Sequence, residues 1–192
     1  MSVYCDMLFP TFVVYNDNDD IINDSTVNFA RELVKKNLDK PFHSPCYSTV
    51  NKLGNVLDYK EFSIIKERIV FCLGAYLQRN KIKRENLKFS CSWINLYEQH
   101  GYQDLHNHNG SMISGVFYLK SDGNKDLIFQ SPSHFFQPLA PNYEEINSEN
   151  CSNIEYESKV GRCFIFPSHL MHRTLPATSE RISLSFNVIY SR

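Results

Sequence analysis

Hydrophobic positions recur at helical spacing in two segments of the N-terminal half of the chain. The first stripe lies within residues 26–38 and comprises Phe29, Leu33 and Val34. The second stripe lies within residues 59–79 and comprises Phe62, Ile65, Ile69, Cys72, Leu73 and Tyr76. These patterns predict two amphipathic helices, the first of them capped by Ser25, a residue type that accepts hydrogen bonds at helix N-termini. The segment 40–58 between them contains prolines and little periodicity, so it is predicted to be a loop.

The pattern changes after residue 86, where short runs of β-branched and aromatic residues alternate with turn residues. The predicted strands lie within 88–98, 111–120, 125–132, 153–160, 162–168 and 181–191, with one more at 8–15 before the helices. Closely spaced strands with glycine-containing turns favour a sandwich or barrel over alternating strand–helix units. We therefore expect one domain over 1–192, with helical support over about 1–85 packed on one sheet of a β-rich core over about 86–192.

Charge and composition narrow the functional classes. The 192 residues carry a formal net charge of −1, so no global positive field would attract a nucleic acid. No apolar run approaches the roughly 18 residues of a membrane-spanning helix, and the N-terminus lacks the features of a signal peptide. The six cysteines are scattered without a C-x-x-C motif, which favours reduced thiols in a cytoplasmic protein.

Two of the seven histidines, His106 and His108, stand one residue apart before a strand-like run. If they begin that strand, their side chains project to the same side. His172, which follows another predicted strand, is the candidate third ligand of a metal with open coordination positions. The other histidines, at 43, 100, 134 and 169, are expected to be surface or structural residues.

The last predicted strand has one polar and one apolar face. Its polar positions, two residues apart, are Arg181, Ser183, Ser185 and Asn187, and its apolar positions are Ile182, Leu184, Phe186 and Val188. If the polar face points into a barrel, it lines a ligand cavity in which Arg181 binds a carboxylate. If it points outward, the guanidinium and hydroxyls are solvated, and this strand alone does not decide between the two arrangements.

Four segments of the β-rich half resemble the Fe(II)/2-oxoglutarate-dependent dioxygenases, in particular the prolyl-hydroxylase-like branch and small oxygenases of this type from marine bacteria and their phages. The segments are SWINLYEQHGYQDLHNHN, SGVFYL, GRCFIFPSHLMHRTLP and ERISLSFNVIY. The resemblance covers about residues 90–192. It implies a double-stranded β-helix (jelly-roll, cupin-like) core.

The resemblance also implies roles for individual residues. His106 and His172 match the two histidine ligands of the family, and His108 stands where most members have Asp or Glu. The residues matched to co-substrate binding are Arg181, Ser183, Tyr118, Tyr97 and Asn95. Asp104, two residues before His106, is expected to orient a ligand imidazole rather than to bind the metal.

The function implied by the resemblance is hydroxylation of an organic substrate with release of succinate and CO2. Fe(II) would be the cofactor, 2-oxoglutarate the co-substrate and ascorbate an optional reductant. The substrate would be a small molecule or a peptide, and a homodimer is compatible with the sequence. Two alternatives stay open: a three-histidine Zn-dependent hydrolase or lyase on a cupin-like barrel, and a non-catalytic small-acid-binding barrel. The segment 131–150 is either a lid over the site or a disordered excursion.

Overall fold

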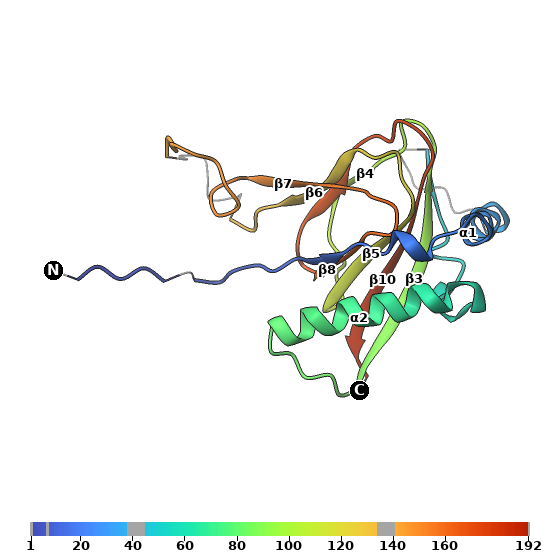
Figure 1. Cartoon of the computed structure of the whole chain (residues 1–192), viewed down its shortest axis with the longest axis horizontal. Helices are drawn as coiled ribbons and strands as arrows, with labels where there is room; N and C mark the ends of the chain where they lie inside the picture. The colour runs from blue at the N-terminus through green and yellow to red at the C-terminus, as the bar shows by residue number, and fades with distance from the viewer. Residues whose placement is uncertain (1, 7, 38–44, 134–140, 192) are drawn as a thin grey trace.

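The residues that the structure describes form two antiparallel β-sheets and two α-helices (Figure 1). The computed structural model describes residues 2–6, 8–37, 45–133 and 141–191. The larger sheet has the strand order β1-β8-β5-β10-β3-β2, and the smaller one β4-β9-β6-β7. Their pairings are antiparallel and join strands distant in sequence, as a double-stranded β-helix requires. The predicted jelly-roll fold is therefore confirmed.

Each strand belongs to one of the two sheets, and the helices pack on the larger one. The larger sheet consists of β1 (Val14–Asn16), β2 (Cys46–Ser48), β3 (Leu87–Tyr97), β5 (Ile113–Lys120), β8 (Cys163–Pro167) and β10 (Arg181–Tyr190). The smaller sheet consists of β4 (Gln103–His106), β6 (Lys125–Gln130), β7 (Asn153–Glu157) and β9 (His172–Thr174).

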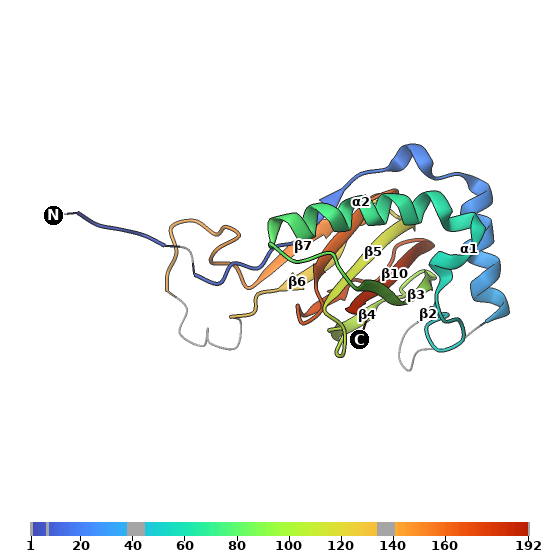
Figure 2. The ribbon, with the colours of Figure 1, turned by 90° about the horizontal axis from the view of Figure 1, so that it is seen from below.

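Helices α1 (Asp24–Lys36) and α2 (Ser63–Arg79) cover the outer face of the larger sheet (Figures 1 and 2). Their buried side chains join the apolar face of β10 in one hydrophobic cluster. Burying a Leu, Ile or Phe side chain contributes roughly 1.5–3 kcal/mol, so this cluster is the main stabilising layer. The expectation that the helices pack on one sheet is confirmed.

Several predicted boundaries differ from the structure. Asn23, not Ser25, caps α1, because its Oδ1 accepts a hydrogen bond from the Thr26 backbone N–H at 3.0 Å. The segment 40–58, predicted as a loop, contains β2 and the 3-10 helix Val56–Asp58. A second 3-10 helix, Lys60–Phe62, forms the start of the segment 59–79 predicted as the second helix, so α2 begins later than predicted, at Ser63.

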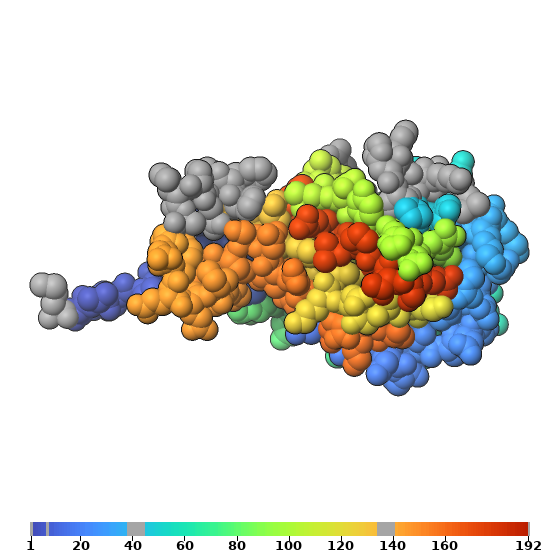
Figure 3. Space-filling model, turned by 90° about the horizontal axis from the view of Figure 1, so that it is seen from above, coloured from blue at the N-terminus to red at the C-terminus, as the bar shows by residue number. Residues whose placement is uncertain are grey.

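The strand predicted at 8–15 is confined to β1, because only residues from Val14 onward pair with β8. Phe9 has a φ of 58°, a left-handed conformation that does not continue an extended strand. The N-terminal residues 2–6 project from the body of the molecule beyond the orange segment 141–152 (Figure 3), and Val3 and Tyr4 are exposed.

The prediction that His106 and His108 begin one strand is wrong. His106 ends β4 in the smaller sheet, whereas β5 of the larger sheet begins at Ile113. His108 lies in the connection, where its backbone N–H donates to the Ser168 carbonyl at 2.9 Å. Gly110 adopts a φ of 87° there, which turns the chain from one sheet to the other.

Gly115 on β5 permits close approach of its two neighbouring strands in the larger sheet, the β8 backbone on one side and the Phe186 ring of β10 on the other. A Cβ at this position would lie 2.5 Å from the Phe164 carbonyl oxygen and would overlap the Phe186 ring. We expect Gly115→Ala to lower the free energy of unfolding by about 1–3 kcal/mol, as measured by urea denaturation. Gly54→Ala is the control, because a Cβ at Gly54 would meet nothing within 4 Å. Equal stability of the two variants would contradict this packing role.

Candidate active site

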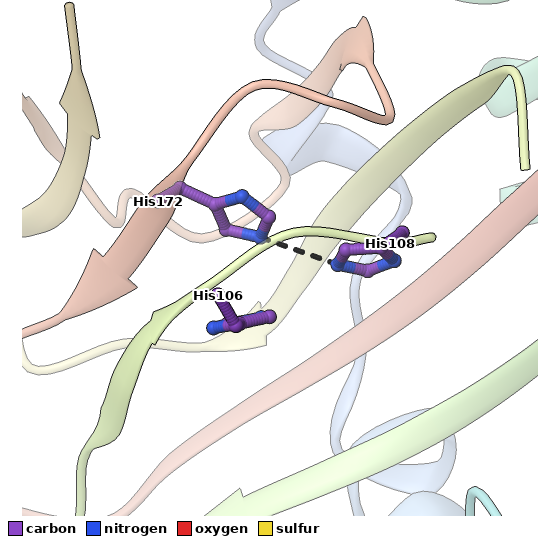
Figure 4. A group of neighbouring side chains, drawn as sticks. All are labelled: His106, His108 and His172. Atoms are coloured by element: carbon purple, nitrogen blue, oxygen red, sulfur yellow. Dashed lines mark hydrogen bonds between the residues drawn. The ribbon is translucent and has the colours of Figure 1, made fainter. Parts of the chain in front are cut away.

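Three imidazoles converge between the two sheets (Figure 4). His106 ends β4 and faces His172, its cross-strand partner at the start of β9, while His108 approaches from the connection between β4 and β5. One ring nitrogen of each lies within 4.8 Å of the others, and the Nε2 atoms of His108 and His172 are 3.2 Å apart. The predicted three-histidine cluster therefore forms, although its two neighbouring members come from different local structures.

Hydrogen bonds fix the tautomer of each ring. Nδ1 of His106 lies 2.7 Å from the Asp104 carbonyl oxygen, and Nδ1 of His172 lies 2.9 Å from the Leu170 carbonyl oxygen. Nδ1 of His108 lies 2.7 Å from Oδ1 of Asn187. Carbonyl oxygens only accept, so each Nδ1 carries the proton and each Nε2 presents a lone pair.

Three inward-facing lone pairs at this separation repel one another unless a cation lies between them. Neutral imidazole Nε2 atoms with Nδ1–H bonded to a carbonyl are the usual form of a metal-bound histidine. The donor set therefore fits a divalent transition metal bound on one side, with coordination positions left for ligands.

Asn187 holds His108 through a buried polar chain that crosses the larger sheet. Its Oδ1 also accepts from the Ser114 hydroxyl at 2.7 Å, and the Ser114 and Ser168 hydroxyls are 2.7 Å apart. The Ser168 carbonyl in turn accepts from the His108 backbone N–H. The sequence placed Asn187 on the polar face of the last strand and left the direction of that face open; it did not predict that Asn187 orients a ring of the cluster.

Burial keeps the three rings neutral. Desolvation lowers the pKa of His172 to about 3, with the neighbouring imidazoles adding to the shift. It lowers the pKa of His108 to about 4, against an opposing contribution from the bond to Asn187, and it lowers the pKa of His106 as well. Protons therefore compete poorly with a metal at this cluster near neutral pH.

The same pKa shifts predict how the metal-free protein responds to acid. Each histidine has an unfolded pKa near 6.5 and a lower folded value, so the unfolded state binds more protons in between. Stability is therefore present above pH 6.5 and should fall as the pH drops from 7 to 5. Urea denaturation of the chelator-treated protein measures this slope.

His172→Gln should make that dependence shallower, because the group with the pKa of about 3 is removed. The window from pH 7 to 5 lies above the ordinary carboxyl range, so Asp and Glu contribute little there. An unchanged slope in the variant would show that the cluster is not the source of the acid sensitivity.

A cavity of about 40 Å³ extends from the histidine cluster between the two sheets. Its other lining residues are Trp93, Tyr97, Gln103, Gly115, Val116, Tyr118, Leu127, Phe166, Thr174, Ser183 and Ser185. The mixture of apolar walls with a few polar groups is typical of small-molecule sites. Gln103, Thr174 and Trp93 were not predicted as lining residues, although the first two stand near the histidines in sequence.

The polar face of β10 points inward. Arg181, Ser183, Ser185 and Asn187 are at most 9% exposed. The arrangement with a solvated polar face, left open by the sequence, is therefore wrong, because the residues between these positions pack against the helices. Strand β10 therefore begins with the buried guanidinium of Arg181 and carries Asn187, the hydrogen-bond partner of His108, further along.

Arg181 forms an ion pair with Asp126 of β6, and neither side chain is more than 1% exposed. Its Nη2 donates to the Leu175 carbonyl at 3.1 Å, and its Cζ lies 4.3 Å from the centre of the Tyr97 ring. The sequence left open whether Arg181 is buried or solvated, and it did not identify a partner. The one signal for Asp126 was a carboxylate standing next to the apolar run LIF.

The other predicted co-substrate residues lie beside this pair. Ser183 is in register with Tyr118 on one side and Asn95 on the other, and Arg181 is in register with Tyr97. Burial raises the pKa of Tyr118 to about 12 and that of Tyr97 well above its usual value, so both phenols stay protonated donors. Asn95 does not line the cavity; its Nδ2 donates to the Ser185 hydroxyl at 3.2 Å.

The remaining predicted residues have simpler outcomes. Asp104 orients His106 as expected, but through its backbone carbonyl rather than its carboxylate. His100 and His169 lie outside the cluster, while His43 and His134 lie outside the described residues. The segment 131–150 is described except for 134–140, so its role as a lid is not tested.

All six cysteines are free thiols. Within the described ranges no helix is long and apolar enough to span a membrane.

A protein-family model described as "Putative 2OG-Fe(II) oxygenase" matches residues 91–187. That range includes the three histidines, Arg181 and Asp126. No curated protein sequence matches the chain.

Solved structures of low sequence identity share the fold. A Pseudomonas putida prolyl-4-hydroxylase is 14% identical with a TM-score of 0.63, covering 94% of this chain and 93% of that one. A viral collagen prolyl hydroxylase from Paramecium bursaria Chlorella virus-1, solved as a 2-oxoglutarate complex, is 14% identical with a TM-score of 0.57 and covers 93% and 97%. HygX from Streptomyces hygroscopicus, with nickel, 2-oxoglutarate and hygromycin B bound, is 12% identical with a TM-score of 0.59 and covers 94% and 84%.

A jelly-roll core that brings three imidazoles together has a donor set that could hold a single metal ion. The family model covers half of the chain, and the chain belongs to the 2-oxoglutarate- and Fe(II)-dependent oxygenase family. Fe(II) and 2-oxoglutarate are accordingly its cofactor and co-substrate.

Proposed function

We propose that His106, His108 and His172 hold Fe(II) through their Nε2 atoms and that the cavity beside them binds 2-oxoglutarate for hydroxylation of a small molecule or peptide. The convergence of three unprotonated Nε2 atoms at one end of a buried cavity is the observation that carries this proposal. When bound, the iron supplies dioxygen activation coupled to decarboxylation of 2-oxoglutarate to succinate and CO2.

Other residues of the chain orient the ligand rings and bind the co-substrate. The carbonyls of Asp104 and Leu170 and the Asn187 amide keep the ligand rings in the metal-binding tautomer. The hydroxyls of Tyr118 and Ser183, which line the cavity, donate hydrogen bonds to the co-substrate.

The apolar walls of the cavity exclude water from the reacting groups. Trp93 and Phe166 flank the histidine cluster, with ring centroids 5.6 Å and 6.3 Å from that of His108. Leu127 and Val116 complete the apolar lining. A dry site of this kind strengthens the electrostatic interactions inside it and protects reactive intermediates from side reactions.

Release of succinate from 2-oxoglutarate, measured with Fe(II) across a substrate panel, tests this function. The panel should contain prolyl peptides, free amino acids and aminoglycosides, since the structural neighbours include prolyl hydroxylases and a protein solved with hygromycin B. Iron-dependent succinate release that one substrate stimulates is the expected result. Equal release with Zn(II), or none with any substrate and Fe(II), would contradict the proposal.

A further inference from the structure

An apolar groove lies apart from the histidine cluster, between α2, the start of β3 and the end of β10. Its volume is about 210 Å³. Its lining residues are Val70, Leu73, Gly74, Leu77, Arg84, Leu87, Lys88, Phe89 and Val188. An apolar cavity of roughly 150 Å³ is large enough to bind benzene, so this groove has room for an aromatic side chain.

The two charged residues that line the apolar groove are both cations. Arg84 donates from Nη2 to the Gly74 carbonyl at 3.5 Å, so its guanidinium lies against the wall that α2 forms. Among the residues that the structure describes, no carboxylate pairs with Arg84 or Lys88. The apolar groove therefore favours an occupant that combines an apolar side chain with a negative charge.

The N-terminal arm, residues 2–6 and 8–11, has that combination. Leu8 and Phe9 are 72% and 94% exposed, and Asp6 carries the one charge of these residues. Figure 3 shows residues 2–6 projecting away from the body of the molecule. Contiguous apolar side chains in solvent mark an interaction site, because their exposure to water is unfavourable. The N-terminal arm therefore fits the apolar groove in both polarity and charge.

Within one molecule, α2 separates the N-terminal arm from the apolar groove. The arm leaves the body at Phe12, whose ring centre lies 4.1 Å from Cζ of Arg79, and the chain continues into β1 at one edge of the larger sheet. The apolar groove is formed with β3 and β10, toward the other edge. In Figure 2, β1 lies on one side of α2 and the start of β3 on the other. A second copy of the chain presents the same groove without this obstacle.

We propose that the N-terminal arm of one molecule docks in the apolar groove of a second copy. Phe9 enters the groove, and Asp6 faces Arg84 and Lys88. Reciprocal exchange of the two arms gives a closed two-fold dimer, in which each molecule contributes one arm and one groove. The inference is independent of the proposed catalytic function, because neither surface includes a residue that lines the cavity at the histidine cluster.

Sedimentation equilibrium of the whole chain over a range of concentrations tests this inference. The wild type should show a monomer–dimer equilibrium. Burial of one Phe side chain favours association roughly tenfold or more, so Phe9→Ser, which changes both arms, should weaken the dimer at least about 100-fold. Ile146→Ser is the matched control, because it removes an exposed apolar side chain outside the arm. This control should leave the dimer unchanged.

Val70→Glu tests the apolar groove from the other side. Val70 is half exposed, so the fold tolerates a carboxylate there, but the new charge hydrates the groove and repels Asp6. This variant should also weaken the dimer. Phe71→Glu is the matched control, because Phe71 is the next residue of α2, is exposed and does not line the groove. Circular dichroism should show that all four variants are folded.

A mixture of the Phe9→Ser and Val70→Glu proteins separates specific docking from general stickiness. The first variant keeps an intact groove and the second an intact arm, so one arm–groove contact can form between them. The mixture should associate more strongly than either variant alone.

Three results would overturn the inference. The first is a wild type that stays monomeric up to about 1 mM, where even weak complexes form; binding of this monomer to phosphatidylserine vesicles would assign the arm to a membrane surface instead. The second is a dimer that neither Phe9→Ser nor Val70→Glu weakens. The third is a mixture of the two variants that associates no more strongly than each alone.

Discussion

Replacing Arg181 with methionine should destabilise the protein more than any surface substitution, because it leaves the Asp126 carboxylate buried and unpaired. Neither partner is more than 1% exposed, and removing one member of a buried ion pair costs roughly 3–5 kcal/mol. The free energy of unfolding, measured by urea denaturation of the metal-free protein, should fall by about that amount.

The double variant Arg181→Met/Asp126→Leu should recover most of this loss, since a well-packed apolar pair avoids the desolvation of both charges. Lys66→Met is the matched control: it breaks an exposed ion pair with Asp58, and exposed pairs contribute about 0–1 kcal/mol. If the double variant were as unstable as Arg181→Met, the loss would come from packing rather than from the unpaired charge.

The second large effect is expected for His172→Ala, which should abolish metal binding. His172 faces both other rings, with ring centroids 4.3 Å from His106 and 5.0 Å from His108. Removing a hydrogen-bond partner of a ligand costs roughly 10–100-fold in metal affinity, and removing the ligand itself should cost more. Metal content after anaerobic reconstitution and iron-dependent succinate release measure the loss.

His169→Ala is the control for this substitution. His169 lies three residues earlier, is exposed and is not a member of the cluster. The His169→Ala protein should bind metal like the wild type, and circular dichroism should show that both variants are folded. Full metal occupancy in His172→Ala would remove His172 from the ligand set.

The alternation of β10 was predictable because its two faces differ so sharply. Four apolar residues alternate with polar ones, and the burial of the apolar set under α1 and α2 turns the polar set to the inner face of the sheet, where Ser183 and Ser185 line the cavity. The sequence could not decide this alone, since a polar face can also point to water. The covering helices decided it, and their amphipathic stripes were visible in the sequence.

The local geometry of the histidine pair was not predictable from alternation. A two-residue spacing matches a strand, but residues 108–111 form a turn, closed by the Ser111 N–H on the His108 carbonyl, that moves the chain between sheets. The Arg181–Asp126 ion pair could not be predicted from the sequence for a different reason. The two residues are 55 positions apart, on strands of different sheets, so only the tertiary fold brings them together.

If the three imidazoles form the metal site, the binding of 2-oxoglutarate depends on the metal that they hold. The most direct test is an anaerobic titration of 2-oxoglutarate into the wild type and His172→Ala, each with and without Fe(II). We predict binding only to the iron-loaded wild type. Equally tight binding without iron, or retained iron-dependent binding in His172→Ala, would contradict the account.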